Sequence, residues 1–377
     1  MTYYFDYAAT SPIDPLVADE MEYWLRKNCC NASSLYDGGK EAKNAIEKSR
    51  ASVIKLLDAS DAYLIFTSGG TEADNTAIMG GAFYGKAKGR NRIVVSSIEH
   101  HAILETAEFL QNFGFELTVL PVDSYGYVTE EALQAAMGSD VCLVSVMWVN
   151  NELGTIQDIS RLAQIAHDSG ALFHTDAVQA ISSQNVSFNK CGADMMSVSA
   201  HKIYGPKGCG ALAIRKGLEI DSFMHGGQQE SGKRGGTENV ACIAGFGKAA
   251  ELLFERRSNA CIEMKKHRQY MIDQLSAAGA RINSPIDGAP TVLNVAFKNV
   301  EGEGMLFFLN RDGFCLSMGS ACNSKSVEPS HVIRAIKLSD DYARGCIRIS
   351  FGSNQTDDEC KLLAGKIIDI AKRLTVE

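Results

Sequence analysis

Between about residue 60 and residue 215, short apolar runs alternate with amphipathic stretches. The segments between the runs place apolar residues three and four positions apart, as in ISRLAQIAHDSG, where Gly170 is expected to end a helix. This alternation predicts an α/β fold with a mostly parallel sheet covered by helices, and ligand sites at the carboxyl ends of its strands. The predicted strands are 63–68, 92–97, 116–122, 141–149, 171–178, 194–200 and 208–215.

The pattern of apolar and polar residues changes after the glycine-rich segment GGQQESGKRGGT (226–237). Three further strand candidates, VLNVAF, FCLSM and CIRISFG, are separated by helical stretches, and a closing helix is expected near 356–375. We therefore predict a large domain over 14–255 and a smaller α+β domain made of 1–13 and 256–377.

Composition narrows the class of protein. A net charge of −8 and a pI near 5.6 disfavour a protein that mainly binds nucleic acid. The chain shows no export signal and no apolar run of the ~20 residues that a membrane span needs, so a cytoplasmic protein is expected. Most of the 11 cysteines sit in apolar runs without a CxxC pair, which predicts reduced core thiols and no metal site.

The segment FTSGGTEADNTAI predicts a strand, a glycine turn and a helix that begins near Thr71. Glycines such as Gly70 let backbone N–H groups approach an oxyanion, and the helix N-terminus adds a favourable dipole. The pattern is neither GxGxxG nor the Walker motif, so it gives no support to a dinucleotide or ATP site. The alternative is an ordinary strand–turn–helix with Thr71 as its cap.

Two further signals lie at the ends of neighbouring predicted strands. Lys202, in SVSAHKIYGPKG, follows a short apolar strand, where burial would favour a neutral amine able to form a Schiff base. Asp176, in FHTDAVQ, is placed to pair with a pyridinium nitrogen and keep that ring an electron sink. The plainer alternatives are a surface lysine and a helix N-cap aspartate.

Cys322 differs from the other cysteines in its surroundings. The segment SMGSACNSKSVEPSHVI flanks it with small polar residues, which is typical of an exposed loop, and exposure favours a reactive thiolate. An incidental loop cysteine is the alternative.

Taken in order, these segments resemble the cysteine desulfurases of the NifS/IscS type, which have the type I fold of pyridoxal 5'-phosphate (PLP) enzymes and belong to the class V aminotransferase superfamily. The resemblance extends from YFDYAATSPIDP through NASSLY, SSIEHHA, WVNNELG, MHGGQQESGKRGGTEN and NVEGE to IRISFG. It implies a homodimer that removes sulfur from L-cysteine, leaving alanine and a Cys322 persulfide. The persulfide would pass to an acceptor protein, such as an iron–sulfur scaffold or a thiolation protein.

The resemblance also implies roles for single residues. Lys202 would carry the cofactor and remove the substrate α-proton, Cys322 would accept the sulfur, and His100 would stack on the cofactor ring and handle the thiol proton. The substrate carboxylate would be bound by Asn31 and Arg348. The other implied cofactor contacts are Gly70, Thr71, Asn151, Asp176, Gln179, Ser199, His201 and Thr237, the last from a second subunit.

Three residues depart from the family pattern. Ala32 replaces a usual proline, Ser231 a common arginine, and Gly235 a serine or alanine, so cofactor affinity or partner choice is expected to differ. The short stretch after the last helix favours a NifS-like or specialised member over an IscS-type one that docks a scaffold. Three alternatives remain: a selenocysteine lyase, an aminotransferase, and a catalytically degenerate assembly partner. The thiol-bearing loop disfavours the second. The third is disfavoured by the joint presence of Lys202, Asp176, His100 and Cys322.

Overall fold

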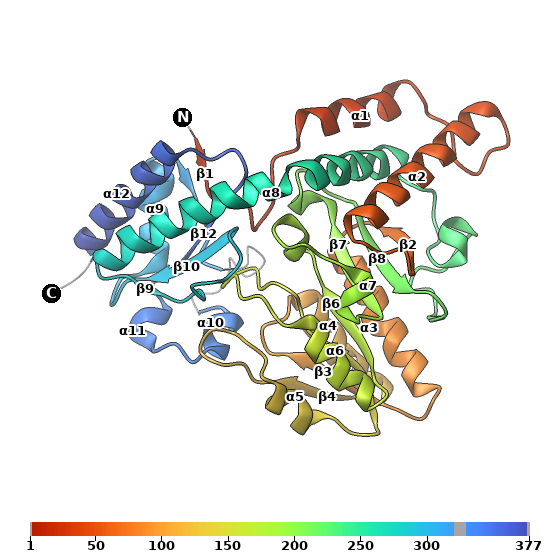
Figure 1. Cartoon of the computed structure of the whole chain (residues 1–377), viewed down its shortest axis with the longest axis horizontal. Coiled ribbons are helices and arrows are strands. Elements are labelled where there is room, and N and C mark those ends of the chain that lie inside the picture. The colour runs from red at the N-terminus through yellow and green to blue at the C-terminus, as the bar shows by residue number, and fades with distance from the viewer. Residues whose placement is uncertain (1, 320–328, 375–377) are drawn as a thin grey trace.

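The computed structural model of the chain describes residues 2–319 and 329–374. Its largest sheet has the strand order β2-β8-β7-β6-β5-β3-β4 (Figure 1). Every pairing from β7 to β4 is parallel, whereas β8 runs antiparallel to both of its neighbours. The prediction of a mostly parallel sheet is thus confirmed. The strands are β2 (Ala62–Thr67), β3 (Arg92–Ser96), β4 (Glu116–Leu120), β5 (Val141–Ser145), β6 (Leu172–Asp176), β7 (Met195–Ser199) and β8 (Gly210–Arg215).

Helices cover both faces of this sheet, because alternate side chains along each strand point to opposite faces. Met195 belongs to the same buried core as Ala77 of α3, whereas its neighbour Met196 belongs to a separate core that includes Phe246 of α8. The helices of this half are α1 (Pro15–Arg26), α2 (Asp37–Leu56), α3 (Gly70–Lys86), α4 (His101–Leu110), α5 (Glu130–Ala136), α6 (Ile159–Asp168) and α7 (Phe188–Cys191). Gly170, with φ 74°, follows α6 as expected.

A second, antiparallel sheet places β10 (Val292–Ala296) between β9 (Arg281–Ile282) and β12 (Cys346–Ser350). The strand expected over FCLSM is shorter than predicted. Only β11 (Phe314–Cys315) forms, and it pairs with the two residues of β1 (Tyr3–Tyr4). Beyond it, Ser317 makes a single isolated bridge to Arg348 of β12. The helices of this half are α9 (Gly302–Arg311), α10 (His331–Ala335), α11 (Asp340–Ala343) and α12 (Asp357–Leu374).

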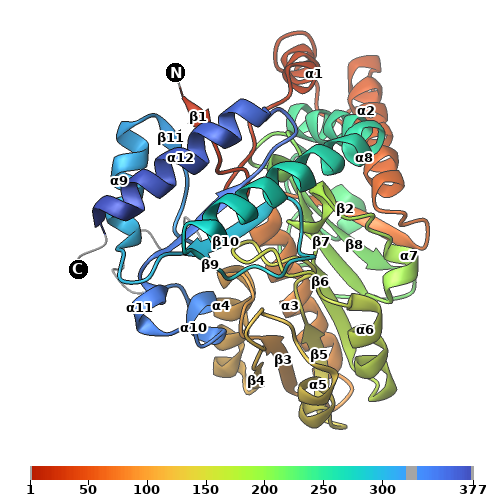
Figure 2. The ribbon, with the colours of Figure 1, turned by 60° about the vertical axis from the view of Figure 1, so that its left-hand side comes forward.

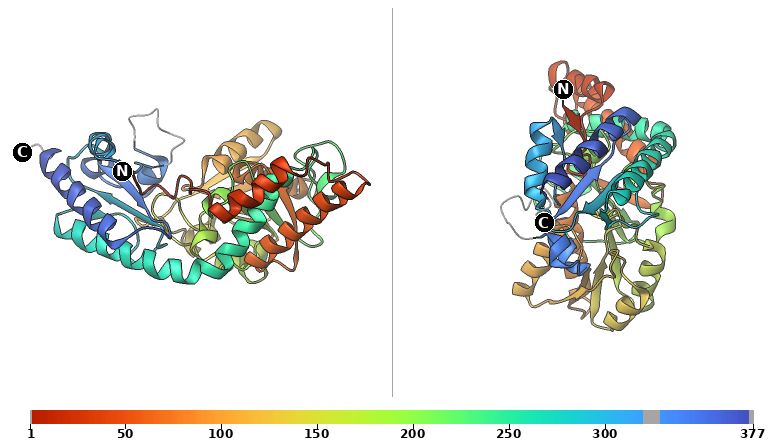
Figure 3. Two further views of the ribbon diagram at one scale, coloured as in Figure 1. Left: turned by 90° about the horizontal axis from the view of Figure 1, so that it is seen from above. Right: turned by 90° about the vertical axis from the view of Figure 1, so that its left-hand side faces the viewer.

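Helix α8 (Val240–Ala277) connects the two halves of the molecule (Figure 2). Its 38 residues correspond to a length of about 57 Å. Its first turns contribute to the core of the large sheet and its last turns to the core of the smaller one, while residues 254–263 include no buried side chain. Seen from above, the helix lies along the length of the molecule (Figure 3). The predicted domain boundary at 255/256 falls within this unburied stretch and stays a prediction.

Within the described ranges, no helix combines the length and the apolar character needed to cross a lipid bilayer. The ten cysteines that the structure describes are free thiols, and five of them (Cys142, Cys191, Cys209, Cys346 and Cys360) are buried, as expected for core residues.

Candidate active site

The carboxyl ends of the large sheet's strands surround a cavity of about 260 Å³. Loops that follow β2, β3, β5, β6 and β7 form most of its wall, and residues from the N-terminal segment and β12 complete it. This is the edge at which ligands bind in open parallel sheets. Ten residues predicted from the sequence line the cavity: Gly70, Thr71, His100, Asn151, Asp176, Gln179, Ser199, His201, Lys202 and Arg348.

The Lys202 amine is held at the cavity wall by backbone carbonyl groups. Lys202 lies in a single 3-10 turn that follows β7, and its Nζ donates hydrogen bonds to Ala8 O at 2.5 Å and Ala9 O at 2.8 Å. Ala8 O also accepts a hydrogen bond from Gln179 Nε2 at 2.9 Å. The N-terminal segment therefore fixes where the amine lies, although the side chains of Ala8 and Ala9 give no sign of this role in the sequence.

Two buried carboxyl groups, Asp176 and Asp74, line the cavity, and a third, Glu99, directly precedes the wall residue His100. Asp176 Oδ1 accepts a hydrogen bond from Val178 N at 2.8 Å, and burial raises the pKa of Asp176 to about 6. Burial, followed by the nearby Asp176 charge, raises the pKa of Asp74 well above its usual range. Burial also raises the pKa of Glu99 to about 8. Of the two carboxyls that line the cavity, Asp176 is thus the one that carries charge most readily.

The N-terminus of α3 offers a place for an oxyanion. The helix begins at Gly70, and a Cβ added there would lie only 3.0 Å from Val178 Cγ2, so a larger residue would crowd this end of the cavity. Ser199 Oγ is buried nearby and has no hydrogen-bond partner among the described residues. A buried hydroxyl normally finds a partner, so an anionic ligand group that accepts from Ser199 and the α3 backbone fits here.

His100 is the N-cap of α4 as well as a wall residue. Its Nδ1 accepts a hydrogen bond from Ala102 N at 3.1 Å, which leaves the ring proton on Nε2. Burial, and then the positive charge of Lys202, lowers the pKa of His100 to about 4. The ring is therefore neutral near pH 7 and presents a hydrogen-bond donor.

Arg348 is the most thoroughly buried cation of the site, with only 1% of the residue exposed. Its Nη2 pairs with Asp6 Oδ1 at 2.8 Å, and its Nη1 donates to Asn151 O at 3.2 Å. Because these contacts anchor the Arg348 guanidinium group on one side, its orientation at the cavity wall is fixed. Asp6 belongs to the segment YFDYAAT, whose resemblance to the family was the only signal of its importance.

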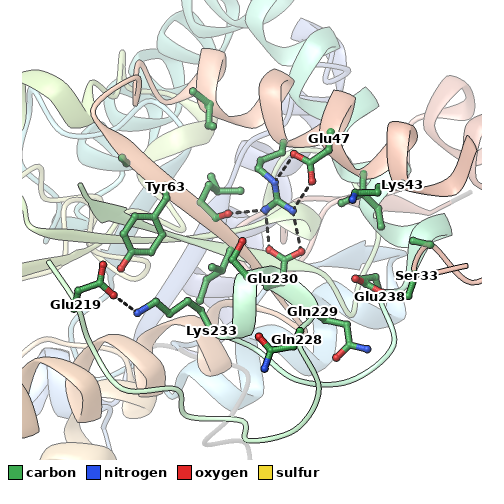
Figure 4. Close-up of a pocket in the computed structure, with 18 residues that line it drawn as sticks. Ser33, Lys43, Glu47, Tyr63, Glu219, Gln228, Gln229, Glu230, Lys233 and Glu238 are labelled. Carbon is green, nitrogen blue, oxygen red and sulfur yellow. Dashed lines mark hydrogen bonds and ion pairs between the residues drawn. The ribbon is translucent and has the colours of Figure 1, made fainter. Parts of the chain in front are cut away.

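Two predicted site residues, Asn31 and Thr237, do not line this cavity. Asn31 is exposed and its Oδ1 accepts from Ser33 N at 2.8 Å, and Thr237 is exposed as well. Cys322 lies outside the described residues. The neighbours of Asn31 and Thr237 (Ala32, Ser33 and Glu238) instead line a second, larger cavity of about 870 Å³ (Figure 4).

The larger cavity is built around paired charges. Glu230 accepts from Arg50 at 2.7 and 2.9 Å, the contacts drawn at Glu230 as dashed lines in Figure 4. It also accepts from Phe66 N at 2.9 Å. Glu230 and Ser231 both have positive φ, 49° and 57°, so this loop is held in a conformation that non-glycine residues seldom adopt.

Close packing explains one of the sequence departures. A Cβ at Gly235 would lie 2.7 Å from Gly226 Cα, so the serine or alanine usual at this place would displace the backbone. Nothing in the structure explains Ala32.

Residues 3–363 match the family model described as Aminotransferase class-V, and the chain belongs to this family. It is 44% identical over 359 residues to the cysteine desulfurase IscS of Dictyoglomus turgidum, covering 94% of this chain and 91% of that protein. Among solved structures, a NifS-like protein superimposes with a TM-score of 0.93 at 37% identity, covering 99% of this chain and 100% of that one. A structure of SspA in complex with cysteine gives 0.81 at 33% identity, over 94% and 100%. The predicted resemblance is confirmed.

Proposed function

We propose that this protein is a PLP-dependent cysteine desulfurase. It takes sulfur from L-cysteine, releases L-alanine, and passes the sulfur through a Cys322 persulfide to an acceptor protein. The observation that carries the proposal is the single cavity of a class-V aminotransferase chain in which Lys202, Asp176, His100 and Arg348 meet. The similarity to proteins named cysteine desulfurase supports the choice of substrate.

The cavity residues fit PLP group by group. Lys202 supplies the amine for covalent attachment, and Asp176 supplies a carboxylate for the protonated ring nitrogen. The phosphate would be held by the α3 N-terminus with Gly70 and Thr71, and by the unpartnered Ser199 Oγ together with His201. When bound, PLP withdraws electrons from the α-carbon of the amino acid attached to it. Asn151 and Gln179 complete the proposed cofactor contacts.

The protein residues then bind substrate and move protons. Arg348 offers its fixed fork to the substrate carboxylate, and the Lys202 amine removes the α-proton and returns it. His100 is neutral and already protonated on Nε2, so it is better suited to stack and donate than to accept the thiol proton. This favours the stacking role of His100 over the proton-acceptor role that the resemblance implied.

Sulfur transfer needs a second thiol. The Cys322 thiolate attacks the substrate sulfur, forming an S–S bond while the substrate Cβ–S bond breaks. The electron pair of the broken bond stays with the carbon skeleton, which takes up protons to become alanine. The sulfur on Cys322 is then available to an acceptor protein, as an iron–sulfur scaffold or a thiolation protein would require.

We also propose a homodimer. Thr237 and Asn31 are exposed and flank the 870 Å³ cavity, so a second copy could supply them to a neighbouring active site. A polar, partly open surface of this kind fits a partner rather than a small ligand, because its main charged groups (Arg50 with Glu230, and Lys233 with Glu219) are already paired.

Product analysis tests the proposed function. The purified protein with PLP should form alanine from L-cysteine, with one sulfur released or protein-bound for each alanine. Parallel reactions with L-selenocysteine, and with amino donors plus a keto acid, separate a lyase and an aminotransferase. Faster turnover of selenocysteine with little reaction on cysteine would identify the lyase, and amino-group transfer the aminotransferase. A protein that neither binds PLP nor reacts would be an assembly partner.

The affinity for PLP is expected to fall as the pH is lowered through about 6. The Asp176 pKa is near that value, so the carboxyl gains a proton below it and loses its attraction for the ring N–H⁺. One extra proton changes affinity by at most about tenfold per pH unit. Equilibrium titrations of the protein with PLP between pH 5 and 8 would measure this. Asp176→Asn is the control, because it lacks the Asp176 carboxyl but still responds to protonation of the PLP phosphate. Parallel slopes for the two proteins would contradict the prediction.

Replacing Arg348 with lysine is expected to raise the KM for L-cysteine by about 10- to 100-fold, because one bidentate contact is worth about 1.5–3 kcal/mol. Lysine keeps the charge near Asp6 but cannot form the fork. Steady-state kinetics at saturating PLP would show the change mainly in KM. Arg344→Lys, on the exposed end of α11, is the matched control. An unchanged KM would place the carboxylate elsewhere.

A further inference from the structure

Two residues that flank the segment 320–328 meet at one buried carboxyl group. Ser330 Oγ donates a hydrogen bond to Glu152 Oε2 at 2.6 Å. A Cβ added at Gly319 would lie 2.9 Å from the same oxygen and 3.3 Å from Ser330 Cβ. Glu152 is fully buried. The described chain on either side of the segment that contains Cys322 is therefore brought together at Glu152.

The turn that carries Glu152 is itself fixed. Asn150 Oδ1 accepts hydrogen bonds from Glu152 N at 2.9 Å and Leu153 N at 2.8 Å, and its Nδ2 donates to Ile98 O at 3.1 Å. The residue between them, Asn151, lines the active-site cavity. Glu152 thus belongs to the same fixed turn as a residue of the cavity wall.

The chain before Gly319 is also tied to the cavity. Ser317 pairs with Arg348 as an isolated β-bridge, with Arg348 N donating to Ser317 O at 2.6 Å. Ser317 Oγ donates to Asp6 Oδ2 at 2.9 Å, and Asp6 is the carboxylate that anchors the Arg348 guanidinium. The backbone leading to Gly319 is therefore positioned by the residue proposed to bind substrate.

The chain after Ser330 is tied to the histidine side of the cavity. His331 Nε2 bonds to Glu99 O at 2.9 Å. Its ring packs edge-on against His101, with centroids 4.6 Å apart. His101 is the first residue of α4, and His100, its neighbour, lines the cavity.

We propose that Glu152 is a positioning residue for sulfur transfer, because it holds together Gly319 and Ser330, which lie on either side of the segment that contains Cys322. The inference rests on the proposed function. Three peptide units separate Cys322 from Gly319, and three units span at most about 11 Å, so the place of Gly319 limits where the thiol can go. Effective concentration at a reaction centre falls steeply when such an anchor is lost.

Substitutions at Ser330 test the contact without altering any residue of the cavity wall. Ser330→Ala removes the donor to Glu152, and Ser330→Asp replaces it with a second carboxyl. Because Ser330 also caps α10 through Ile333 N at 3.2 Å, aspartate keeps a capping group while alanine does not. Ser330→Thr keeps both functions. Thr129→Ala removes a similar cap from α5, far from the segment, and serves as the matched control.

In single-turnover reactions of the PLP-loaded enzyme, Ser330→Ala and Ser330→Asp should form the Cys322 persulfide at least about tenfold more slowly, as loss of a hydrogen bond to a carboxyl group implies. The Kd for L-cysteine, followed by the cofactor absorbance, should change less than twofold. Ser330→Thr and Thr129→Ala should behave as the wild type. Equal rates in all variants, or a slower rate matched by an equal loss of cysteine binding, would overturn the proposal.

Hydrogen exchange gives a readout that does not depend on turnover. Amides of 317–319 and 330–332 should exchange faster in Ser330→Ala and Ser330→Asp than in Ser330→Thr, because their common anchor is lost. Unchanged exchange would overturn the anchor even if the rates fell. If the wild type formed no persulfide while the exchange result held, the proposed function would be at fault and the Glu152 contact would stand as a structural one.

Discussion

Replacing Lys202 with alanine is expected to lower alanine formation from L-cysteine by at least about 10³-fold. The variant loses both the amine that attaches PLP and the base that removes the α-proton, and general acid–base catalysis alone contributes about 10²–10⁴-fold. The cofactor should also leave the protein on desalting. Rates of alanine formation and the absorbance of the desalted protein would measure the two effects.

Lys207→Ala is the matched control for that variant. Lys207 lies in the same glycine- and proline-containing loop but is exposed and does not line the cavity. It should keep the wild-type rate and its cofactor. Retention of PLP by Lys202→Ala through gel filtration, together with a rate within tenfold of the wild type, would show that another amine attaches the cofactor.

Replacing Cys322 with alanine is expected to remove the protein-bound sulfur and to lower sulfur release by at least about 10²-fold, because no cysteine among the described residues lines the cavity to replace it as the acceptor. The absorbance change when L-cysteine is added should persist, since the residues of the cavity wall are unaltered. Labelled cysteine sulfur, traced on the protein under non-reducing conditions, would measure the effect.

Cys29→Ala provides the comparison, because Cys29 is an exposed thiol that could also be oxidised. This variant should carry as much labelled sulfur as the wild type. Equal labelling of Cys322→Ala and the wild type would contradict the assignment of the acceptor thiol, while leaving the cofactor site untouched.

Most of the large sheet could be predicted, because strands buried on both faces leave apolar runs that stand out from amphipathic helices. The antiparallel direction of β8 was not predicted, although the length of the connection from β7 to β8 indicates it. About ten residues separate β7 from β8, which is too few for the crossover that a parallel pair needs. The two-residue pairing of β1 with β11 left no comparable signal, since short strands at distant positions carry no period of their own.

The residues of the candidate site also differ in whether local sequence could predict them. Lys202 and Asp176 could be proposed from local chemistry, because each follows a strand whose end lies at the edge where ligands bind. The carbonyls of Ala8 and Ala9 that hold the Lys202 amine could not, since backbone acceptors have no side-chain signature. The place of Arg348 depends on long-range pairing with Asp6, and its role came from the family resemblance. Cys322 depends on that resemblance entirely.

The unburied middle of α8 has a consequence for how this enzyme can vary over evolution. Residues 254–263 include no fully buried side chain, although Ala260 and Cys261 pack, partly buried, against the smaller core. The helix nevertheless connects the half that contains Arg348 to the half that contains Lys202. A single inserted residue would rotate one end against the other by about 100°, and a proline would bend the axis. We therefore expect substitutions within this stretch to be tolerated more readily than insertions or deletions.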